Sequence, residues 1–323
     1  MRRGASRRTP APRPPCTALF ACGCTALLLI FAHLILRWRA EAAELARGGA
    51  AWRRELAAAA SGVLPQPLPI LIPAADRPEY LAQTLAALSA VVGINGTVLV
   101  FSQDGSDGAV ARLIAGVDFA PVIHLRHAPP LAAALLPRSD AVTAANVRFL
   151  LGWAFDVARA RGAIVLESDI ELSPDALGYF SWALEALEAN PALAARVLTV
   201  NGYGERSARG GDPAAFSRDA EGFMVWGWLC PAASWPRLLA GWTWWHNWDF
   251  AVEAARRAGG LVSLTPAVSR ARHVGLRGIN FRVAAGSPDA AKWTQHHIQP
   301  TAVDYTNLRV RLPSASGEPG ERG

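Results

Sequence analysis

The sequence predicts an α/β protein with a mostly parallel β-sheet, behind an N-terminal membrane-spanning helix. From Leu68 onward, short apolar runs alternate with segments whose apolar residues recur at helical spacing. Such alternation is typical of a parallel sheet covered by helices on both faces. Before that point, residues 17–36 form one long apolar segment. With 323 residues, 51% of them hydrophobic, the chain is large enough to bury a substantial core.

The individual strands and helices follow from this alternation. Apolar runs predict strands at Leu68–Ile72, Thr97–Phe101, Pro121–Leu125, Ala163–Leu166 and Val197–Val200. Helical spacing predicts helices at Glu79–Val92, Val110–Ala115, Ala141–Ala160, Pro174–Ala189 and Asp249–Ala258. For the fourth helix, Ser173 is the expected N-cap and Pro174 the first helical residue.

The N-terminal segment 17–36 has the length needed to cross a bilayer and carries no fixed charge. Arginines crowd the first fifteen residues, which favours a cytoplasmic N-terminus and a single-pass type II protein with its body in the lumen. A cleaved signal peptide is the alternative. With the type II anchor, residues 1–16 are a cytoplasmic tail and residues 37–66 a stem, in which Gly48-Gly49 is expected to interrupt a helix.

Charge and cysteine content exclude several classes of protein. The net charge is +6, but the excess arginine lies at the N-terminus and the body has no basic helix, so no nucleic-acid partner is expected. Three of the four cysteines lie in or beside the apolar segment, which leaves Cys230 alone in the body without a possible internal disulfide. Asn95-Gly-Thr97 is either a glycosylation sequon or an ordinary turn.

The segment Ala163–Asp175 is the most informative part of the chain. A buried apolar strand ends abruptly in Glu167, Asp169 and Glu171. Open α/β sheets bind ligands at the carboxyl ends of their strands, and carboxylate oxygens are ligands that Mg²⁺ and Mn²⁺ prefer. The segment is therefore either a metal-diphosphate site or a strand that ends in solvent.

Two later regions are further candidates. Tryptophans are concentrated near the C-terminal third of the chain, where they could stack on sugar rings or simply fill the core; they are Trp226, Trp228, Trp235, Trp242, Trp244, Trp245 and Trp248. Asp249 follows them, and is either a desolvated general base or an acid that favours the start of a helix. The basic, glycine-containing segment Ser269–Asn280 could fold over phosphates or form a surface loop.

Taken together, these segments resemble the N-acetylglucosaminyltransferase I and II families and their protein O-mannose relative. The resemblance covers about Leu68 to Phe281 and rests on six segments in the family's order. They are Pro69–Arg77, Val100–Asp104, Val165–Asp175, Gly227-Trp228, Trp248-Asp249 and Pro266–Gly275. The resemblance implies a GT-A nucleotide-sugar transferase fold over residues 67–300, with a donor half at 67–175, an acceptor half at 176–300 and a C-terminal tail at 301–323.

The resemblance also implies a reaction. The family is a group of Golgi membrane enzymes that use UDP-N-acetylglucosamine and Mn²⁺ and transfer the sugar, with inversion, to O2 of a mannose on a glycoprotein N-glycan in β1,2 linkage. Carried over by position, Asp169 would bind the metal and Asp249 would be the catalytic base. The donor would be contacted by Arg77, Asp104, Glu167, Ser168 and Asn280.

The chain departs from the family in several places. Ser168 stands where the family usually has a second acid, and Leu150 is the nearest residue to a donor-contacting His of the family. The paired cysteines of animal relatives are missing from the body, and the sequence ends soon after the donor loop. These departures leave two alternatives: a related transferase with another UDP-sugar or an O-mannose acceptor, or an inactive lumenal glycan-binding homologue.

Overall fold

A computed structural model describes residues 16–60, 68–127, 140–207, 209–218, 222–242, 247–278 and 282–309. The chain divides into two compact units, residues 1–42 and 43–323. The first contains the N-terminal part of the long helix α1 (Cys16–Ala60), and the second contains everything described below. Among the residues whose side chains the structure describes, which begin after residue 24, no helix is both long and apolar enough to cross a membrane.

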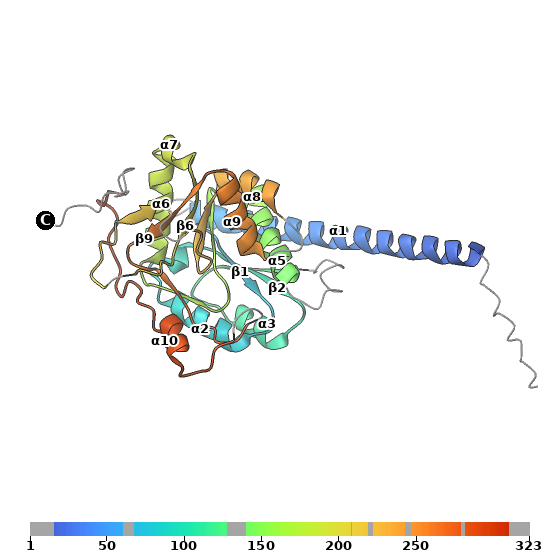
Figure 1. Ribbon diagram of the computed structural model, residues 1–323, viewed down its shortest axis with the longest axis horizontal. Helices are drawn as coiled ribbons and strands as arrows, with labels where there is room; N and C mark the ends of the chain where they lie inside the picture. Colours follow the sequence, from blue (N-terminus) through green and yellow to red (C-terminus); the bar gives the residue numbers. More distant parts are fainter. Residues whose placement is uncertain are drawn as a thin grey trace, which may run out of the picture. The chain divides into compact units, whose positions relative to one another are not determined.

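The core of the second unit is a mixed sheet of eight strands within the described part of the chain, in the order β3-β2-β1-β4-β8-β6-β9-β7 (Figure 1). All but β8 and β7 run in the same direction, which confirms the predicted α/β class with a mostly parallel sheet. The strands are β1 (Ile70–Ala74), β2 (Leu99–Asp104), β3 (Val122–His127), β4 (Gly162–Val165), β6 (Val197–Asn201), β7 (Phe216–Arg218), β8 (Trp228–Pro231) and β9 (Val262–Pro266).

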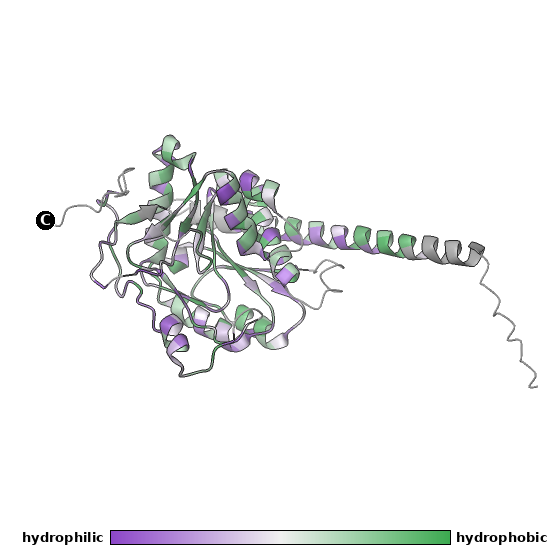
Figure 2. Cartoon of the chain, in the orientation of Figure 1, coloured by the Kyte–Doolittle hydropathy of each residue, from purple (hydrophilic) through white to green (hydrophobic). Residues whose placement is uncertain are grey.

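The strands read as continuous apolar runs because both faces of the sheet are covered. In β1, Ile70 and Ile72 belong to one apolar cluster and Leu71 to the other, and all three are fully buried. The central strands accordingly appear hydrophobic along their length (Figure 2). Successive side chains of a strand thus enter the two clusters in turn. This fixes the register of each strand in the sheet, since a shift by one residue would exchange its two faces.

Helices form a layer on each side of the sheet. One cluster contains side chains of α2 (Pro78–Ser89), α3 (Gly108–Ala115) and α6 (Ala176–Glu188). The other contains side chains of α5 (Asp140–Gly152), α8 (Trp235–Gly241) and α9 (Trp248–Ala258), which lie together in Figure 1. The shorter elements are α7 (Pro191–Ala194), α10 (Pro288–Thr294), the 3₁₀ turns η1 (Ile94–Gly96) and η3 (Ala232–Ser234), and the π turn η2 (Trp153–Val157).

The expected break at Gly48-Gly49 is wrong, because α1 continues through both glycines. A Cβ atom on Gly48 would lie 2.5 Å from Nε1 of Trp153, and one on Gly49 would lie 2.5 Å from a methyl group of Val157. The glycines therefore allow the helix to pack closely on the π turn η2. The packing of the helix against the body outweighs the low helix propensity of glycine.

Two predicted helix boundaries also need correction. The helix expected at Ala141–Ala160 ends at Gly152, and the π turn η2 follows it. The helix expected from Pro174 begins at Ala176 with Asp175 at the N-cap. Ser173 does not cap it, because its hydroxyl donates instead to the Asp175 carboxylate over 2.6 Å.

A second, two-stranded sheet follows the acidic segment. Strand β5 (Ile170–Leu172) pairs antiparallel with β10 (Ala271–His273), so that Ile170 lies opposite His273 and Leu172 opposite Ala271. This pairing joins two parts of the chain that lie about a hundred residues apart in sequence. It brings the basic segment from residue 269 onward beside the acidic segment.

Candidate active site

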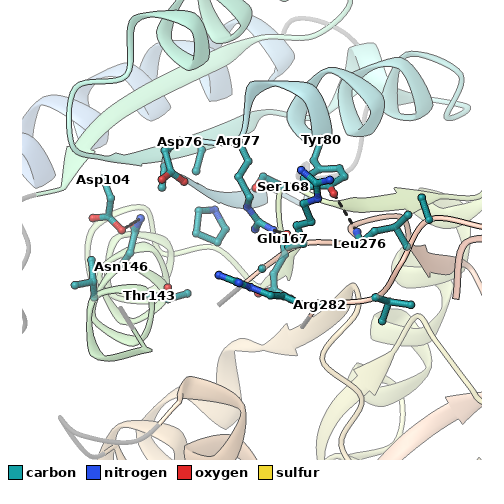
Figure 3. Close-up of a pocket in the computed structure, with 18 of the residues that line it drawn as sticks. Asp76, Arg77, Tyr80, Asp104, Thr143, Asn146, Glu167, Ser168, Leu276 and Arg282 are labelled. Carbon is teal, nitrogen blue, oxygen red and sulfur yellow. Dashed lines mark hydrogen bonds between the residues drawn. The ribbon is translucent and has the colours of Figure 1, made fainter. Parts of the chain in front are cut away.

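A cavity of about 1100 Å³ lies at the carboxyl edge of the parallel strands (Figure 3). It lies where β1, β2 and β4 end, because parallel strands present their carboxyl ends at one edge of a sheet. Four of the predicted donor-binding residues line this cavity: Arg77, Asp104, Glu167 and Ser168. The fifth, Asn280, lies outside the residues that the structure describes.

Asp104 is held in place from both sides. It is the last residue of β2 and lies opposite His127, the last residue of β3. Nδ1 of His127 is 2.5 Å from Oδ1 of Asp104, and the amide nitrogen of Asn146 donates to Oδ2 over 2.9 Å. The carboxylate is therefore fixed at one end of the cavity, where it can accept a hydrogen bond from a ligand.

Helix α5 contributes Asn146 to the cavity, not Leu150. Leu150 is buried in the apolar core, whereas Asn146 lies one turn earlier and lines the cavity beside Asp104 (Figure 3). The amide nitrogen of Asn146 also donates to the carbonyl of Ser102 over 3.0 Å. Its amide oxygen is buried and has no hydrogen-bond partner among the described residues, so it is available to a donor group of a ligand.

Arg77 connects the cavity to the acidic segment. Its Nη1 donates to Oδ2 of Asp169 over 2.7 Å and to the carbonyl of Arg277 over 3.0 Å. Its guanidinium also lies 5.6 Å from the centre of the Tyr80 ring, in a cation–π contact. Tyr80 in turn accepts a hydrogen bond from the backbone of Leu276 over 3.1 Å, which ties α2 to the segment after β10.

The two acids of the motif have opposite pKa shifts. Burial raises the pKa of Glu167 to about 8, and the nearby negative charges of Asp169 and Asp249 add to this effect. Burial also opposes ionisation of Asp169, but His273 and the charge of Arg77 outweigh it and lower the pKa of that carboxyl. Asp169 is thus the carboxylate that stays charged.

The basic segment lies directly against Asp169 and forms part of the cavity lining. The backbone of Val274 donates to the carbonyl of Asp169 over 2.9 Å, and Leu276, Arg277 and Gly278 line the cavity. A Cβ atom on Gly275 would lie 2.6 Å from Oδ2 of Asp169, so only glycine fits there. Arg282, from the same part of the chain, extends into the cavity (Figure 3).

Asp249 lies in the first turn of α9 and is half-buried. Burial raises its pKa, with a further contribution from the charge of Asp140. It does not line the cavity, but its charge acts on Glu167. Of the tryptophans before it, Trp228, Trp235 and Trp248 are core residues, Trp226 and Trp242 are half-buried, and Trp244 and Trp245 lie outside the described residues.

The residues around Asp169 fit a divalent cation held by a single protein carboxylate. Its Oδ1 atom is buried and has no hydrogen-bond partner in the described part of the chain, so this oxygen is the one left for a cation. The described residues contain no cluster of three or more His, Cys, Asp or Glu side chains that could hold a metal. The remaining ligands would therefore have to come from the donor and from water.

Sequence reasoning missed the residues that support the predicted ones. The expected third strand ended at Leu125, two residues before His127, so its position opposite Asp104 was not foreseen. Asn146 and Tyr80 lie on helices, where a polar residue facing a site cannot be distinguished from one facing solvent. A third strand extended by two residues would have placed His127 beside Asp104. For Asn146 and Tyr80 the sequence contains no comparable indication.

Comparisons with known proteins show what the chain is similar to. The human alpha-1,6-mannosyl-glycoprotein 2-beta-N-acetylglucosaminyltransferase is 36% identical over 61 residues, which is 19% of this chain and 14% of the human enzyme. Among solved structures, the mannosyltransferase PcManGT from Pyrobaculum calidifontis, in complex with GDP-Man and Mn²⁺, is 13% identical with a TM-score of 0.43, covering 78% of this chain and 70% of its own. The galactosyltransferase LgtC is 13% identical with a TM-score of 0.40, covering 61% and 73%.

The family assignment rests on a much longer match. The sequence matches the GNT-I family over residues 41–287, which includes every described residue of the cavity and both Asp169 and Asp249. The chain therefore belongs to the GNT-I family of glycosyltransferases.

Proposed function

We propose that this GT-A glycosyltransferase moves N-acetylglucosamine from UDP-N-acetylglucosamine to O2 of an α-mannose on an N-glycan, with inversion and with Mn²⁺. The observation that carries the proposal is the convergence of three separate strand ends on one cavity. Arg77 follows β1, Asp104 ends β2, and Glu167 and Ser168 both follow β4; all four residues line the same space. Its volume of about 1100 Å³ is ample for a nucleotide-sugar.

The two ends of the cavity suit the two ends of the donor. Asp104 and the amide oxygen of Asn146 are hydrogen-bond acceptors and suit an N–H edge of the nucleobase. Arg77, Arg277 and Arg282 bring positive charge to the other part of the lining and would bind the diphosphate. Glu167 and Ser168 line the same cavity, where they would bind hydroxyls of the ribose and of the transferred sugar.

The reaction itself needs a proton acceptor and a leaving group on opposite faces of the sugar. The bond from mannose O2 to the anomeric carbon forms as the bond from that carbon to the diphosphate oxygen breaks, and UDP leaves with the electron pair. Asp249 would take the proton from the mannose hydroxyl, and its raised pKa makes it a better proton acceptor than an ordinary carboxylate. Mn²⁺ bound at Asp169 would neutralise the charge that develops on the departing diphosphate.

The test is transfer from a panel of UDP-sugars to mannose-terminated N-glycans, with Mn²⁺ and with a chelator. We expect turnover with UDP-N-acetylglucosamine and Mn²⁺, loss of turnover with the chelator, and loss of metal-dependent donor binding in Asp169→Ala. Preference for another UDP-sugar, or for an O-mannosylated peptide added as a second acceptor, would support the related-transferase alternative.

The inactive-homologue alternative rests on Ser168, which lines the cavity where the family usually has a second acid, and on Leu150, the nearest residue to the family's donor-contacting His. It predicts that mannose-terminated glycans bind but that no donor in the panel is turned over. Such a result would rule out the transfer reaction proposed here. Ser168→Asp separates the two cases further, because regained turnover would assign the defect to this position.

We also propose that residues 17–36 anchor the protein in the Golgi membrane with the body in the lumen. The support is the uncharged apolar segment and the arginines that precede it. Protease treatment of sealed vesicles should leave the body intact and should remove only the first residues. Digestion of the body in intact vesicles would contradict this orientation.

A further inference from the structure

Asp169, the proposed metal ligand, already has a positively charged partner within the protein. Nη1 of Arg77 lies 2.7 Å from Oδ2 of Asp169, and the Asp169 side chain is only 5% exposed. A buried carboxylate is strongly destabilised unless a positive charge compensates it. Arg77 therefore supplies, within the chain, the charge that a metal ion would otherwise supply.

A second basic side chain lies beside the same oxygen atom. Nε2 of His273, the last residue of β10, is 3.6 Å from Oδ2 of Asp169. The other oxygen, Oδ1, is buried without a hydrogen-bond partner in the described part of the chain. A cation that binds Oδ1 while Arg77 is in this position would be repelled by the guanidinium only a few ångströms away.

Arg77 is placed so that it can change partners. Its side chain is 33% exposed and lines the cavity, whereas the side chain of Asp169 is almost fully enclosed. Apart from Asp169, its guanidinium contacts the backbone carbonyl of Arg277 and the face of the Tyr80 ring. A diphosphate in the cavity would offer the guanidinium several charged oxygens in exchange for one carboxylate oxygen.

We infer that Arg77 couples the binding of the diphosphate to the binding of the metal. In the donor-free protein its guanidinium occupies Asp169 and weakens metal binding; a bound diphosphate draws the guanidinium away and frees the carboxylate. Arg77 is thus a positioning residue for Asp169 in addition to a donor contact. Because coupling is reciprocal, metal and nucleotide each raise the affinity of the protein for the other. This inference rests on the proposed function, since it requires Asp169 to be the metal ligand.

The test measures metal binding rather than activity. Free Mn²⁺ is followed by electron paramagnetic resonance during titration of the protein, without and with saturating UDP, for the wild type and for Arg77→Gln. We expect the variant to bind Mn²⁺ without UDP about 5- to 150-fold more tightly than the wild type does, the usual range for coupled sites. The enhancement by UDP should shrink by a similar factor, although ligation of Mn²⁺ by UDP itself remains.

Two further variants separate the coupling from general electrostatics. Arg272→Gln removes the same charge from a neighbouring arginine whose partner is Glu171, at 2.6 Å, and should leave Mn²⁺ binding without UDP unchanged. Arg77→Lys keeps the charge and should retain the weak binding of the wild type. Thermal unfolding curves establish that each variant is folded before it is titrated.

The outcomes distinguish this inference from the function on which it rests. If the wild type binds Mn²⁺ in the presence of UDP but Arg77→Gln shows no gain without UDP, the coupling by Arg77 is wrong and the metal site stands. An equal gain in Arg272→Gln also overturns the coupling. If no form of the protein binds Mn²⁺ even with UDP, the metal assignment in the proposed function fails, and the inference fails with it.

Discussion

Arg270 and Asp175 form an ion pair that is completely enclosed in the protein. Nε of Arg270 lies 3.2 Å from Oδ2 of Asp175, and both side chains have no exposed surface. The hydroxyl of Tyr305 donates to the same carboxylate oxygen over 2.6 Å. The pair joins the residues just after β5 to the residue just before β10, and so holds together the two strands that place Asp169 beside Gly275.

Replacing Arg270 should therefore destabilise the whole domain. Arg270→Met leaves the Asp175 carboxylate buried without a positive partner, which typically costs 3–5 kcal/mol. We expect a loss of about that size in the free energy of unfolding measured with urea. Arg257→Met is the control, because Arg257 pairs with Glu253 but is 75% exposed, and it should cost less than about 1 kcal/mol. Similar losses for the two variants would show that enclosure of the Arg270 pair is unimportant.

Gly275→Ala should disable the site while leaving the fold intact. The added methyl group would lie 2.6 Å from Oδ2 of Asp169, so the carboxylate or the segment after β10 must move. We expect donor binding, measured by calorimetry with UDP and Mn²⁺, to fall about tenfold or more. Gly108→Ala, where the nearest atom is the end of the Arg112 side chain at 3.4 Å, should bind normally. Normal donor binding by Gly275→Ala would contradict the placement of this segment against Asp169.

Asp249→Asn should separate chemistry from binding. The amide has nearly the same size as the carboxylate but cannot accept the proton from the acceptor hydroxyl. We expect kcat to fall by about 10²- to 10⁴-fold, with the Kd for UDP-N-acetylglucosamine unchanged because Asp249 does not line the donor cavity. Turnover close to that of the wild type would remove Asp249 from the role of base. Equal losses in kcat and donor affinity would place it in the donor site.

Glu253 should make the stability of α9 depend on pH. Hydrogen bonds from Arg256, and to a smaller extent from Arg257, lower the pKa of Glu253 to about 2 from an ordinary value of 4.5. A lowered pKa in the folded state stabilises the protein above pH 4.5, and this stabilisation is lost as the pH falls toward 2. At pH 7, Glu253→Gln should therefore unfold with a free energy about 1–2 kcal/mol below that of the wild type.

The pH series itself checks this assignment. The difference between wild type and Glu253→Gln should shrink steadily between pH 4.5 and pH 2 in thermal or urea unfolding. Glu185→Gln is the matched control, since Glu185 is 57% exposed and 3.6 Å from its arginine partner, and it should change little at any pH. A difference for Glu253→Gln that does not vary over this range would mean that its ion pairs contribute nothing to stability.

Much of the fold follows from local features of the sequence. The five predicted strands are present with ends shifted by a few residues, because a strand buried on both faces must be apolar along its length. The acidic segment was correctly placed at the carboxyl end of β4, since a change from apolar to acidic residues marks where a buried strand reaches the edge of the sheet. Asp104 was predicted from the family resemblance, and it is the last residue of β2.

What the sequence could not determine was which side chains meet across the fold. Arg77 and Asp169 lie 92 residues apart, and Asp175 and Arg270 lie 95 apart, so neither pair leaves a periodic pattern. Their contacts depend on the order of strands in the sheet and on the pairing of β5 with β10. The same holds for Gly48-Gly49, where packing against η2 overrides a local preference against helix. Sequence alone determined the apolar elements and the acids at their ends, because both depend on neighbouring residues; tertiary structure decided the partners of those acids, because long-range packing selects them.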